Sequence, residues 1–262
     1  MNTMLRCNEF SFSLAGVSII DGINFSLKKG EYLSIIGPNG SGKSTLLKCL
    51  LRLHEGGQSR GQIQLFGQPI TEYSQRDLAR HMAYVPQAGG RIPPFTVAEF
   101  LKLSRYPYSA HRNALSLQDK GEVARALELT DMQGLAHKNL ATLSGGERQR
   151  AFLAAALAQG TDVLLLDEPA SFLDPRHAAG LNALLKYLNR QQGMTIITVT
   201  HDLNHPLDAG GQVLVLRHGW QAFFGPSSQL AIPGILEAAF EHRFTYLKHP
   251  TTGKPLVLAE QC

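Results

Sequence analysis

The chain has 262 residues, of which 44% are hydrophobic and 18% charged, a length that suits one large α/β domain or a core domain carrying a smaller inserted one. The hydrophobic fraction excludes a disordered chain, and a formal net charge of +4 is too small to indicate a nucleic-acid-binding protein. The three cysteines form no CxxC pair, which argues against a disulfide framework or a zinc site and fits a reducing cytosol.

The sequence gives no sign of a membrane span. The N-terminus lacks the apolar segment of a signal peptide. The longest apolar stretches, at residues 151–158 and 163–166, are far shorter than the roughly 20 residues that cross a bilayer. We therefore expect a soluble chain, which could still dock on a membrane protein.

The first 87 residues predict mainly strands. Alternating or continuous apolar runs indicate strands at 19–27, 32–36, 62–66 and 82–85, with one helix at 43–53. From residue 88 the pattern changes to loops and helices, and helices are expected over 96–104 and 119–129. We interpret 88–160 as an inserted, mainly helical region.

Strand–helix alternation resumes after residue 160. The continuous apolar run Asp162–Leu166 is typical of a strand buried on both faces. A helix is predicted to begin at Asp174-Pro175, because proline favours the first helical position. Further core strands are expected over 195–200 and 212–216.

A glycine-rich segment separates the strand at 32–36 from the helix at 43. It matches the P-loop pattern, in which glycines let backbone N–H groups point at phosphate oxygens and the following helix adds its positive dipole end. The Lys43 ammonium can reach the β- and γ-phosphates, and the Ser44 hydroxyl can ligate Mg²⁺. The strand–loop–helix context disfavours an ordinary glycine turn. The members are Gly37, Pro38, Asn39, Gly40, Ser41, Gly42, Lys43, Ser44 and Thr45.

Two carboxylates follow the apolar strand at 163–166. Ligands of open α/β sheets bind at the carboxyl ends of strands, so Asp167 is placed to hold Mg²⁺, mostly through water. Glu168 is placed to act as a general base on an attacking water. The alternative is that both carboxylates are solvated acids in a turn. The presence of the P-loop in the same chain makes this alternative less favoured.

A second anion site is predicted in the helical region. Ser144 and Glu147 fit the S-x-x-E capping box at a helix start. Gly145 and Gly146 between them leave backbone N–H groups bare at that helix N-terminus, which favours an anion. A well-capped helix without a ligand is the simpler alternative.

Together these motifs resemble those of the nucleotide-binding subunit of ATP-binding cassette (ABC) transporters. GPNGSGKST corresponds to the Walker A motif, VLLLDE to Walker B and LSGGERQR to the signature, in the family's order and spacing. The resemblance covers nearly the whole chain as a single ABC ATPase domain. It implies an α/β fold: a P-loop NTPase core with a mixed sheet over 1–87 and 161–262, an N-terminal antiparallel β subdomain, and an inserted helical signature subdomain over 88–160.

The resemblance also assigns roles to further residues. Gln87 corresponds to the Q-loop glutamine, which touches Mg²⁺ and the attacking water, and His201 to the switch histidine at the γ-phosphate. Ser171–Asp174 resembles the D-loop, which places Asp174 among the nucleotide-binding residues. His201 and His205 have the i, i+4 spacing of a metal pair, but no third ligand has suitable spacing and Pro206 follows at once, so this reading is disfavoured.

The sequence departs from the family pattern at two places. Leu14 stands where an aromatic residue usually stacks on adenine, and Phe12 is the candidate substitute. Phe172 replaces the usual small residue of the D-loop, where it could alter the dimer seam, and Ala170 replaces a frequent threonine.

The resemblance implies a composite site. Two copies pair head to tail, so that Ser144 and Gly146 of one chain contact the γ-phosphate of the ATP held by the other. The implied partners are a second copy, transmembrane permease subunits and, indirectly, a substrate-binding protein, with no nucleic acid. The chain would lie peripherally on the cytoplasmic face of the inner or plasma membrane.

The segments 95–97 and 103–107 resemble the FTV…GRYP stretch of importers for iron–siderophores, haem and cobalamin, although Ser104 replaces a glycine. The tail 235–258 resembles theirs too, and the implied docking groove lies at 87–108. A transporter of another cargo stays open. A soluble ABC ATPase of translation or DNA repair is disfavoured by the single cassette without sustained heptads, and a regulator without hydrolysis by Glu168 and His201.

Overall fold

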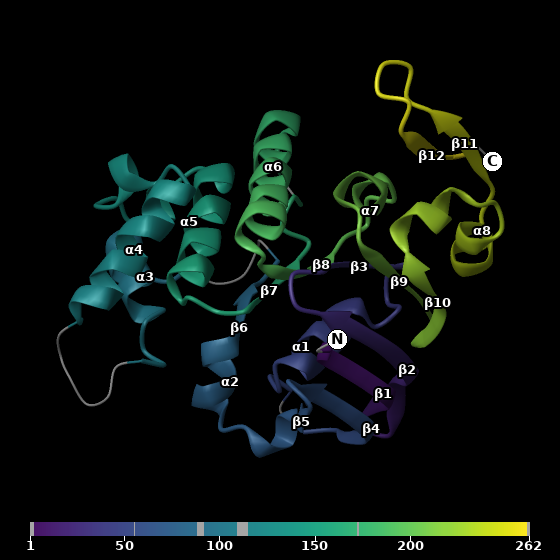
Figure 1. Ribbon diagram of the computed structural model, residues 1–262, viewed down its shortest axis with the longest axis horizontal. Helices are drawn as coiled ribbons and strands as arrows, with labels where there is room; N and C mark the ends of the chain where they lie inside the picture. The colour runs from purple at the N-terminus through teal and green to yellow at the C-terminus, as the bar shows by residue number, and fades with distance from the viewer. Residues whose placement is uncertain (1–2, 55, 88–91, 109–114, 172, 261–262) are drawn as a thin grey trace. The chain divides into compact units, whose positions relative to one another are not determined.

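The computed structural model describes residues 3–54, 56–87, 92–108, 115–171 and 173–260 (Figure 1). The chain divides into two compact units, one formed by residues 1–72 with 197–262 and the other by residues 73–196. Strand β8 (Thr195–Val199) spans the division in sequence. The predicted subdomain boundaries at 87/88 and 160/161 stay a prediction. In the described part of the chain, no helix combines the length and the apolar character needed to cross a bilayer.

The first unit is built on a mixed sheet with the strand order β5-β4-β1-β2-β10-β9-β3. Strands β1, β2 and β4 pair antiparallel and lie side by side in Figure 1, whereas β3 pairs parallel with β9. The expected mixed sheet with an antiparallel N-terminal part is therefore confirmed. The strands are β1 (Thr3–Leu14), β2 (Val17–Lys28), β3 (Tyr32–Ile36), β4 (Gln58–Leu65), β5 (Gln68–Pro69), β9 (Gln212–Arg217) and β10 (Trp220–Pro226).

Strand β1 is absent from the sequence predictions. Its pairing with β2 shifts register between Cys7 and Phe10, and Glu9 between them has a positive φ of 46°. Such a bulge breaks the strict alternation of buried and exposed side chains by which a half-buried strand is recognised.

The C-terminal part of the first unit packs on the end of β3. Its buried cluster joins Ile36, Val213 and Val215 to Phe244 and Val257 of the tail. The tail forms a hairpin, drawn in yellow in Figure 1. The elements are α7 (Asn204–Ala209), the short 3-10 helix η4 (Ser227–Ala231), α8 (Ile235–Phe240), β11 (Phe244–Lys248) and β12 (Pro255–Ala259); earlier in the unit lie α1 (Lys43–Leu50) and η1 (Ile70–Glu72).

The second unit combines two parallel strands with a group of helices. Strands β6 and β7 pair in parallel, and α3, α4 and α5 lie together in Figure 1. The predicted helices at 96–104 and 119–129 are confirmed as α3 and α4. They begin after the capping residues Thr96 and Ser116. The elements are α2 (Gln75–His81), β6 (Met82–Val85), α3 (Val97–Leu103), α4 (Leu117–Leu129), η2 (Gln133–Leu135), η3 (Leu140–Thr142), α5 (Gly145–Ala158), β7 (Val163–Asp167) and α6 (Pro175–Gln192).

Candidate nucleotide-binding site

The P-loop runs from the end of β3 to the start of α1, as predicted. Gly37 has a φ of 152°, and a Cβ atom there would lie 2.2 Å from the carbonyl oxygen of Leu216, so only glycine fits. Helix α1 starts from Gly42, which has no side chain to cap the first turn. The N-terminus of α1 therefore has no side-chain oxygen of its N-cap residue against it, as suits a helix start that binds an anion.

The interior of this loop is prepared for an anion. Lys43 is buried, and its Nζ donates to the carbonyl oxygens of Gly37 and Pro38 at 2.8 and 2.9 Å. Ser41 is also buried, and its Oγ has no hydrogen-bond partner among the described residues. Buried polar atoms are normally paired, so an orphaned hydroxyl beside a buried ammonium fits a ligand rich in oxygen acceptors, as ATP phosphates are.

Asp167 is the last residue of β7 and is 4% exposed. Tyr84 of β6 donates its hydroxyl to Asp167 Oδ2 at 3.4 Å. Burial and the charge of Asp167 both raise the pKa of Tyr84, so its hydroxyl keeps its proton as a donor. The carboxylate is thereby held in place at the strand end.

Glu168 follows at once and has an unusual backbone. Its φ of 47° lies in the left-handed region, which costs energy for a residue with a side chain and often marks functional sites. Gln87 Nε2 and Ser171 Oγ both donate to Glu168 Oε2, at 2.7 and 2.9 Å. The structure thus brings Gln87, Asp167 and Glu168 together at the carboxyl ends of β6 and β7.

The capping box at the start of α5 is confirmed. Ser144 Oγ accepts from the Glu147 N–H at 3.3 Å, and Glu147 Oε2 accepts from the Ser144 N–H at 2.8 Å. Hydrogen bonds from the Ser144 backbone N–H and from the Ser144 side chain to the Glu147 carboxylate lower the pKa of Glu147. A Cβ at Gly145 would meet nothing within 4 Å, so the helix start is open at this residue.

His177 is a site residue that sequence reasoning missed. A Cβ at Gly146 would lie 3.2 Å from the His177 ring, so this imidazole lies against the signature glycine. Asp174 caps α6 by accepting from the His177 N–H and Nδ1 at 2.9 and 2.7 Å, which lowers the pKa of Asp174. The predicted helix start at Asp174-Pro175 places His177 at the third helical position. Its contact with Gly146, which lies 31 positions earlier (177 − 146), could not be predicted from the sequence.

The two histidines of the considered metal pair have different surroundings. His201 is exposed just after β8, where the Thr200 N–H donates to the Ile35 carbonyl at 3.1 Å. His205 is 9% exposed, and its Nε2 lies 3.0 Å from the Tyr32 hydroxyl. Within the described ranges, no group of three or more His, Cys, Asp or Glu could hold a metal ion.

Phe12, the candidate for the adenine contact, is 6% exposed, and its ring packs on His54 at a centroid distance of 4.6 Å. Its contact with adenine stays a prediction. Two large hydrophobic side chains are exposed at this end of β1 and β2: Leu14, at 41%, and Val17, at 62%. Phe172 lies outside the described residues.

The predicted site residues divide between the two units. The P-loop and His201 belong to the first unit, whereas Gln87, Asp167, Glu168, Asp174 and the signature residues belong to the second.

Comparison with known proteins decides the family. Residues 20–171, more than half of the chain, match the protein family described as ABC transporter. The chain belongs to the ABC transporter family. It is therefore an ATP-binding subunit of the kind that hydrolyses ATP to power transport.

Relatives of this ABC subunit match along most of its length. The Iron(3+)-hydroxamate import ATP-binding protein FhuC of Bacillus subtilis is 38% identical, over 92% of this chain and 88% of that protein. The Ferric enterobactin transport ATP-binding protein FepC of Escherichia coli is 33% identical, over 97% and 93%.

A solved structure of a putative metal-chelate type ABC transporter, in an inward-facing conformation, superposes with a TM-score of 0.85 at 25% identity, over 99% of this chain and 98% of that one. The predicted fold class is thereby confirmed.

Proposed function

We propose that this ABC ATPase powers a membrane importer for iron–siderophore, haem or cobalamin-type cargo. Two relatives named for import of iron(3+)-hydroxamate and of hemin, and one named for transport of ferric enterobactin, each match more than nine-tenths of this chain and support the cargo class. Cargo does not touch this subunit in the proposed complex. The support for the cargo class therefore comes from sequence similarity along the whole chain rather than from any one residue.

The observation that carries hydrolysis is the hydrogen-bonded group at the end of β7. Glu168 accepts hydrogen bonds from Gln87 and Ser171, which fixes its carboxylate beside Asp167. We assign Glu168 as the general base: it takes a proton from water as the water oxygen bonds to the γ-phosphorus and the bond from that phosphorus to the β–γ bridging oxygen breaks. The products are ADP and inorganic phosphate.

The phosphates would be held by the P-loop. Lys43, now bonded to its own loop carbonyls, would turn to the β- and γ-oxygens, and Ser41 would gain an acceptor. Ser44, Gln87 and Asp167 would hold Mg²⁺, directly or through water, since hard oxygen ligands suit this ion. Bound Mg²⁺ neutralises the charge that develops on the phosphates. His201 would contact the γ-phosphate.

A second copy would complete each site. Ser144, Gly145 and Gly146 would meet the γ-phosphate bound to the partner's P-loop, with Asp174 nearby at the seam. The start of α5 is open at Gly145, where an added Cβ atom would meet nothing within 4 Å, and this supports the role. The shared γ-phosphate would hold the dimer closed, and its hydrolysis would let the dimer open. That cycle would drive permease subunits from the cytoplasmic face of the membrane.

The test of hydrolysis is Glu168→Gln. The variant should bind ATP as the natural protein does, lose at least about a hundredfold in turnover because the general base is gone, and accumulate as an ATP-bound dimer in light scattering. Glu128→Gln makes the same change at an exposed position of α4 and should leave turnover unaltered. Hydrolysis by Glu168→Gln at close to the normal rate would refute the assignment.

The cargo class needs a cellular measurement. A strain without this chain should lose uptake of a radiolabelled ferric chelate, haem or cobalamin, and regain it with the natural protein but not with Glu168→Gln. Unchanged uptake of all three would refute the importer proposal while leaving the ATPase assignment standing.

A further inference from the structure

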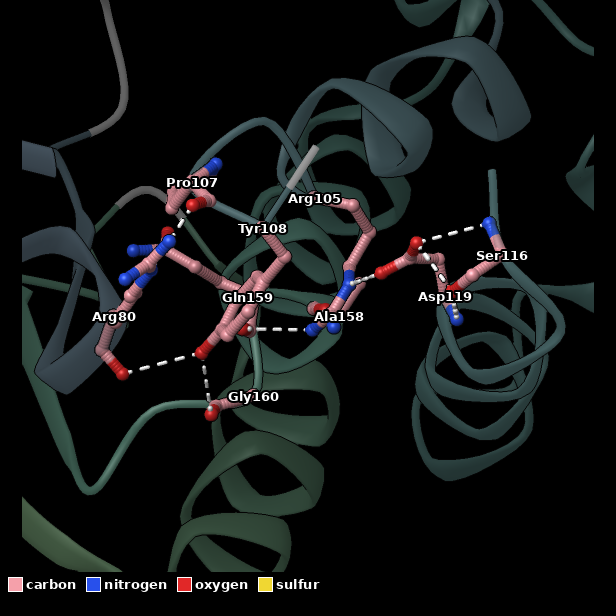
Figure 2. A network of polar contacts seen from close by, with 9 residues as sticks. All are labelled: Arg80, Arg105, Pro107, Tyr108, Ser116, Asp119, Ala158, Gln159 and Gly160. Carbon is pink, nitrogen blue, oxygen red and sulfur yellow. Dashed lines mark hydrogen bonds and ion pairs between the residues drawn. The ribbon is translucent and has the colours of Figure 1, made fainter. Parts of the chain in front are cut away.

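Arg105 is an arginine buried to 3% exposure just after helix α3. Its Nε donates to Asp119 Oδ1 at 2.8 Å, and its Nη1 donates to the carbonyl oxygens of Ala158 and Gln159, both at 2.9 Å (Figure 2). The Tyr108 ring covers the guanidinium at 4.0 Å. Lysine could not make all these contacts at once, because its ammonium is a single point rather than a planar fork.

The partners of Arg105 lie at the ends of two helices. Ala158 is the last residue of α5 and Gln159 its C-cap, so the guanidinium satisfies two carbonyls at the negative end of the signature helix. Asp119 belongs to the capping box of α4, and hydrogen bonds from Ser116 and from Arg105 lower the pKa of this carboxyl. One buried ion pair therefore joins the end of α5 to the start of α4.

A second set of contacts joins the same turn to the strand before Gln87. The Tyr108 hydroxyl lies 3.2 Å from the carbonyl oxygens of both Arg80 and Gly160 and can donate to either (Figure 2). Arg80 Nε donates to the Pro107 carbonyl at 3.0 Å. Arg80 lies in α2, which runs directly into β6. The turn 105–108 is thus fixed to the end of α5 and to the start of β6.

The same segment also has an outward face. Leu103 is 51% exposed and Tyr106 is 74% exposed, while Arg105 between them points into the unit. Arg105 joins this segment to the C-terminal end of α5 through its hydrogen bonds to Ala158 and Gln159. Helix α5 has 14 residues, so its other end, which carries Gly145, lies about 20 Å away at 1.5 Å per residue.

We propose that Arg105 is a positioning residue that sets the placement of the signature helix α5 at its C-terminal end, and thereby the placement of Ser144 and Gly145 at its N-terminal end. The effect on turnover rests on the proposed function, because there the signature residues complete the partner's ATP site. Gly160 fits this role, since a Cβ atom at that position would lie 3.0 Å from Arg105 Nη1 and crowd the guanidinium.

The test is Arg105→Lys in the full-length protein, which keeps the charge but not the fork. Backbone amide NMR signals of Gly145 and Gly146 should shift in the nucleotide-free protein. The turnover number should fall about tenfold, as expected for small misplacements of catalytic groups, while ATP affinity stays within about twofold because the P-loop is untouched. A purely structural contact would move only signals near residues 158–160.

Arg125→Lys is the matched control. This arginine is exposed in α4 and donates to Gln192 Oε1 of α6 at 2.7 Å, so its variant should keep the Gly145 and Gly146 signals and the turnover. Tyr108→Phe keeps the ring and loses only the hydroxyl, so the Gly145 and Gly146 signals should shift in the same direction by a smaller amount. This variant replaces Arg105→Lys in the test if Arg105→Lys does not fold.

Unmoved Gly145 and Gly146 signals in the folded variant, or equal effects in the Arg125 control, would overturn the proposal. The NMR measurement needs no ATP. A natural protein that fails to hydrolyse ATP would therefore count against the proposed function and not against the placement of α5 by Arg105.

Discussion

At the residue scale, the adenine contact is where this chain departs most from its family. Phe12, the aromatic candidate, is already covered by His54. Leu14 and Val17 are exposed at the adjoining ends of β1 and β2. An adenine bound at this end of β1 and β2 would contact these aliphatic side chains through dispersion and apolar burial rather than ring stacking.

Leu14→Tyr tests this inference. A stacked ring adds about 0.5–1.5 kcal/mol beyond area burial, so ATP should bind about two- to tenfold more tightly. Calorimetric titration with ATP measures the change, and inorganic triphosphate, which has no base, should bind both proteins equally. An unchanged ATP affinity would place adenine elsewhere.

Residue roles were predictable where the relevant contacts are local. Lys43, Ser144 and Asp174 act on groups within six residues of themselves, so motif and capping patterns located them. The His177 ring against Gly146 and the His54 ring against Phe12 join distant parts of the sequence. No spacing in a single sequence carries that information.

At the element scale, helix α7 is anchored on both sides just after His201. Asn204 donates its Nδ2 to the Val257 carbonyl at 3.0 Å and accepts from the Val257 N–H at 2.8 Å. On the other side, His205 lies 3.0 Å from the hydroxyl of buried Tyr32, and burial raises the pKa of that tyrosine to about 12. Both anchors restrain the segment that presents His201.

Asn204→Ala should loosen this segment. Loss of two hydrogen bonds, with the Val257 groups left unpaired, should cost about 1–3 kcal/mol of stability. The turnover number should fall more than ATP affinity, because His201 acts on the γ-phosphate in the proposed site. Thermal unfolding and steady-state kinetics measure the two effects. Asn204→Asp keeps only the hydrogen-bond acceptor, so its stability and turnover number should lie between those of the natural protein and Asn204→Ala. Equal turnover numbers for these three proteins would show that the anchor at Val257 does not position His201.

Elements differed in how well the sequence predicted them. Helices α3, α4 and α6 begin at capping residues that are visible in the sequence, and β7 is a continuous apolar run. The predicted helix at 43–53 ends earlier, at Leu50. Strand β12 pairs with β11 in a two-stranded sheet and is a short apolar run that begins with proline, a residue that makes a run a weak strand candidate.

At the scale of the whole molecule, neither unit holds a complete set of site residues. The first unit contains the P-loop and the second contains Asp167, Glu168 and the signature. The order of the three motifs along the chain predicted the fold class, since few folds share it. The division into units was not predictable, because it depends on the density of packing between segments rather than on any local pattern.

Mixing two inactive variants tests the proposed head-to-tail dimer. Lys43→Ala disables one chain's P-loop and Ser144→Arg disables the other chain's signature, so a mixed dimer keeps one intact composite site. With half of the dimers mixed and one of two sites working, turnover should recover to about a quarter of the natural rate. Each variant alone should be inactive. A mixture as inactive as its components would contradict sites shared between chains.

The anchor between Asn204 and Val257 also limits which substitutions the tail tolerates. Both hydrogen bonds go to main-chain atoms of β12, so they are the same whatever side chain stands at position 257, provided that it suits a buried site. Replacing Val257 by another apolar residue of similar size should therefore leave both hydrogen bonds in place, whereas replacing Asn204 removes them.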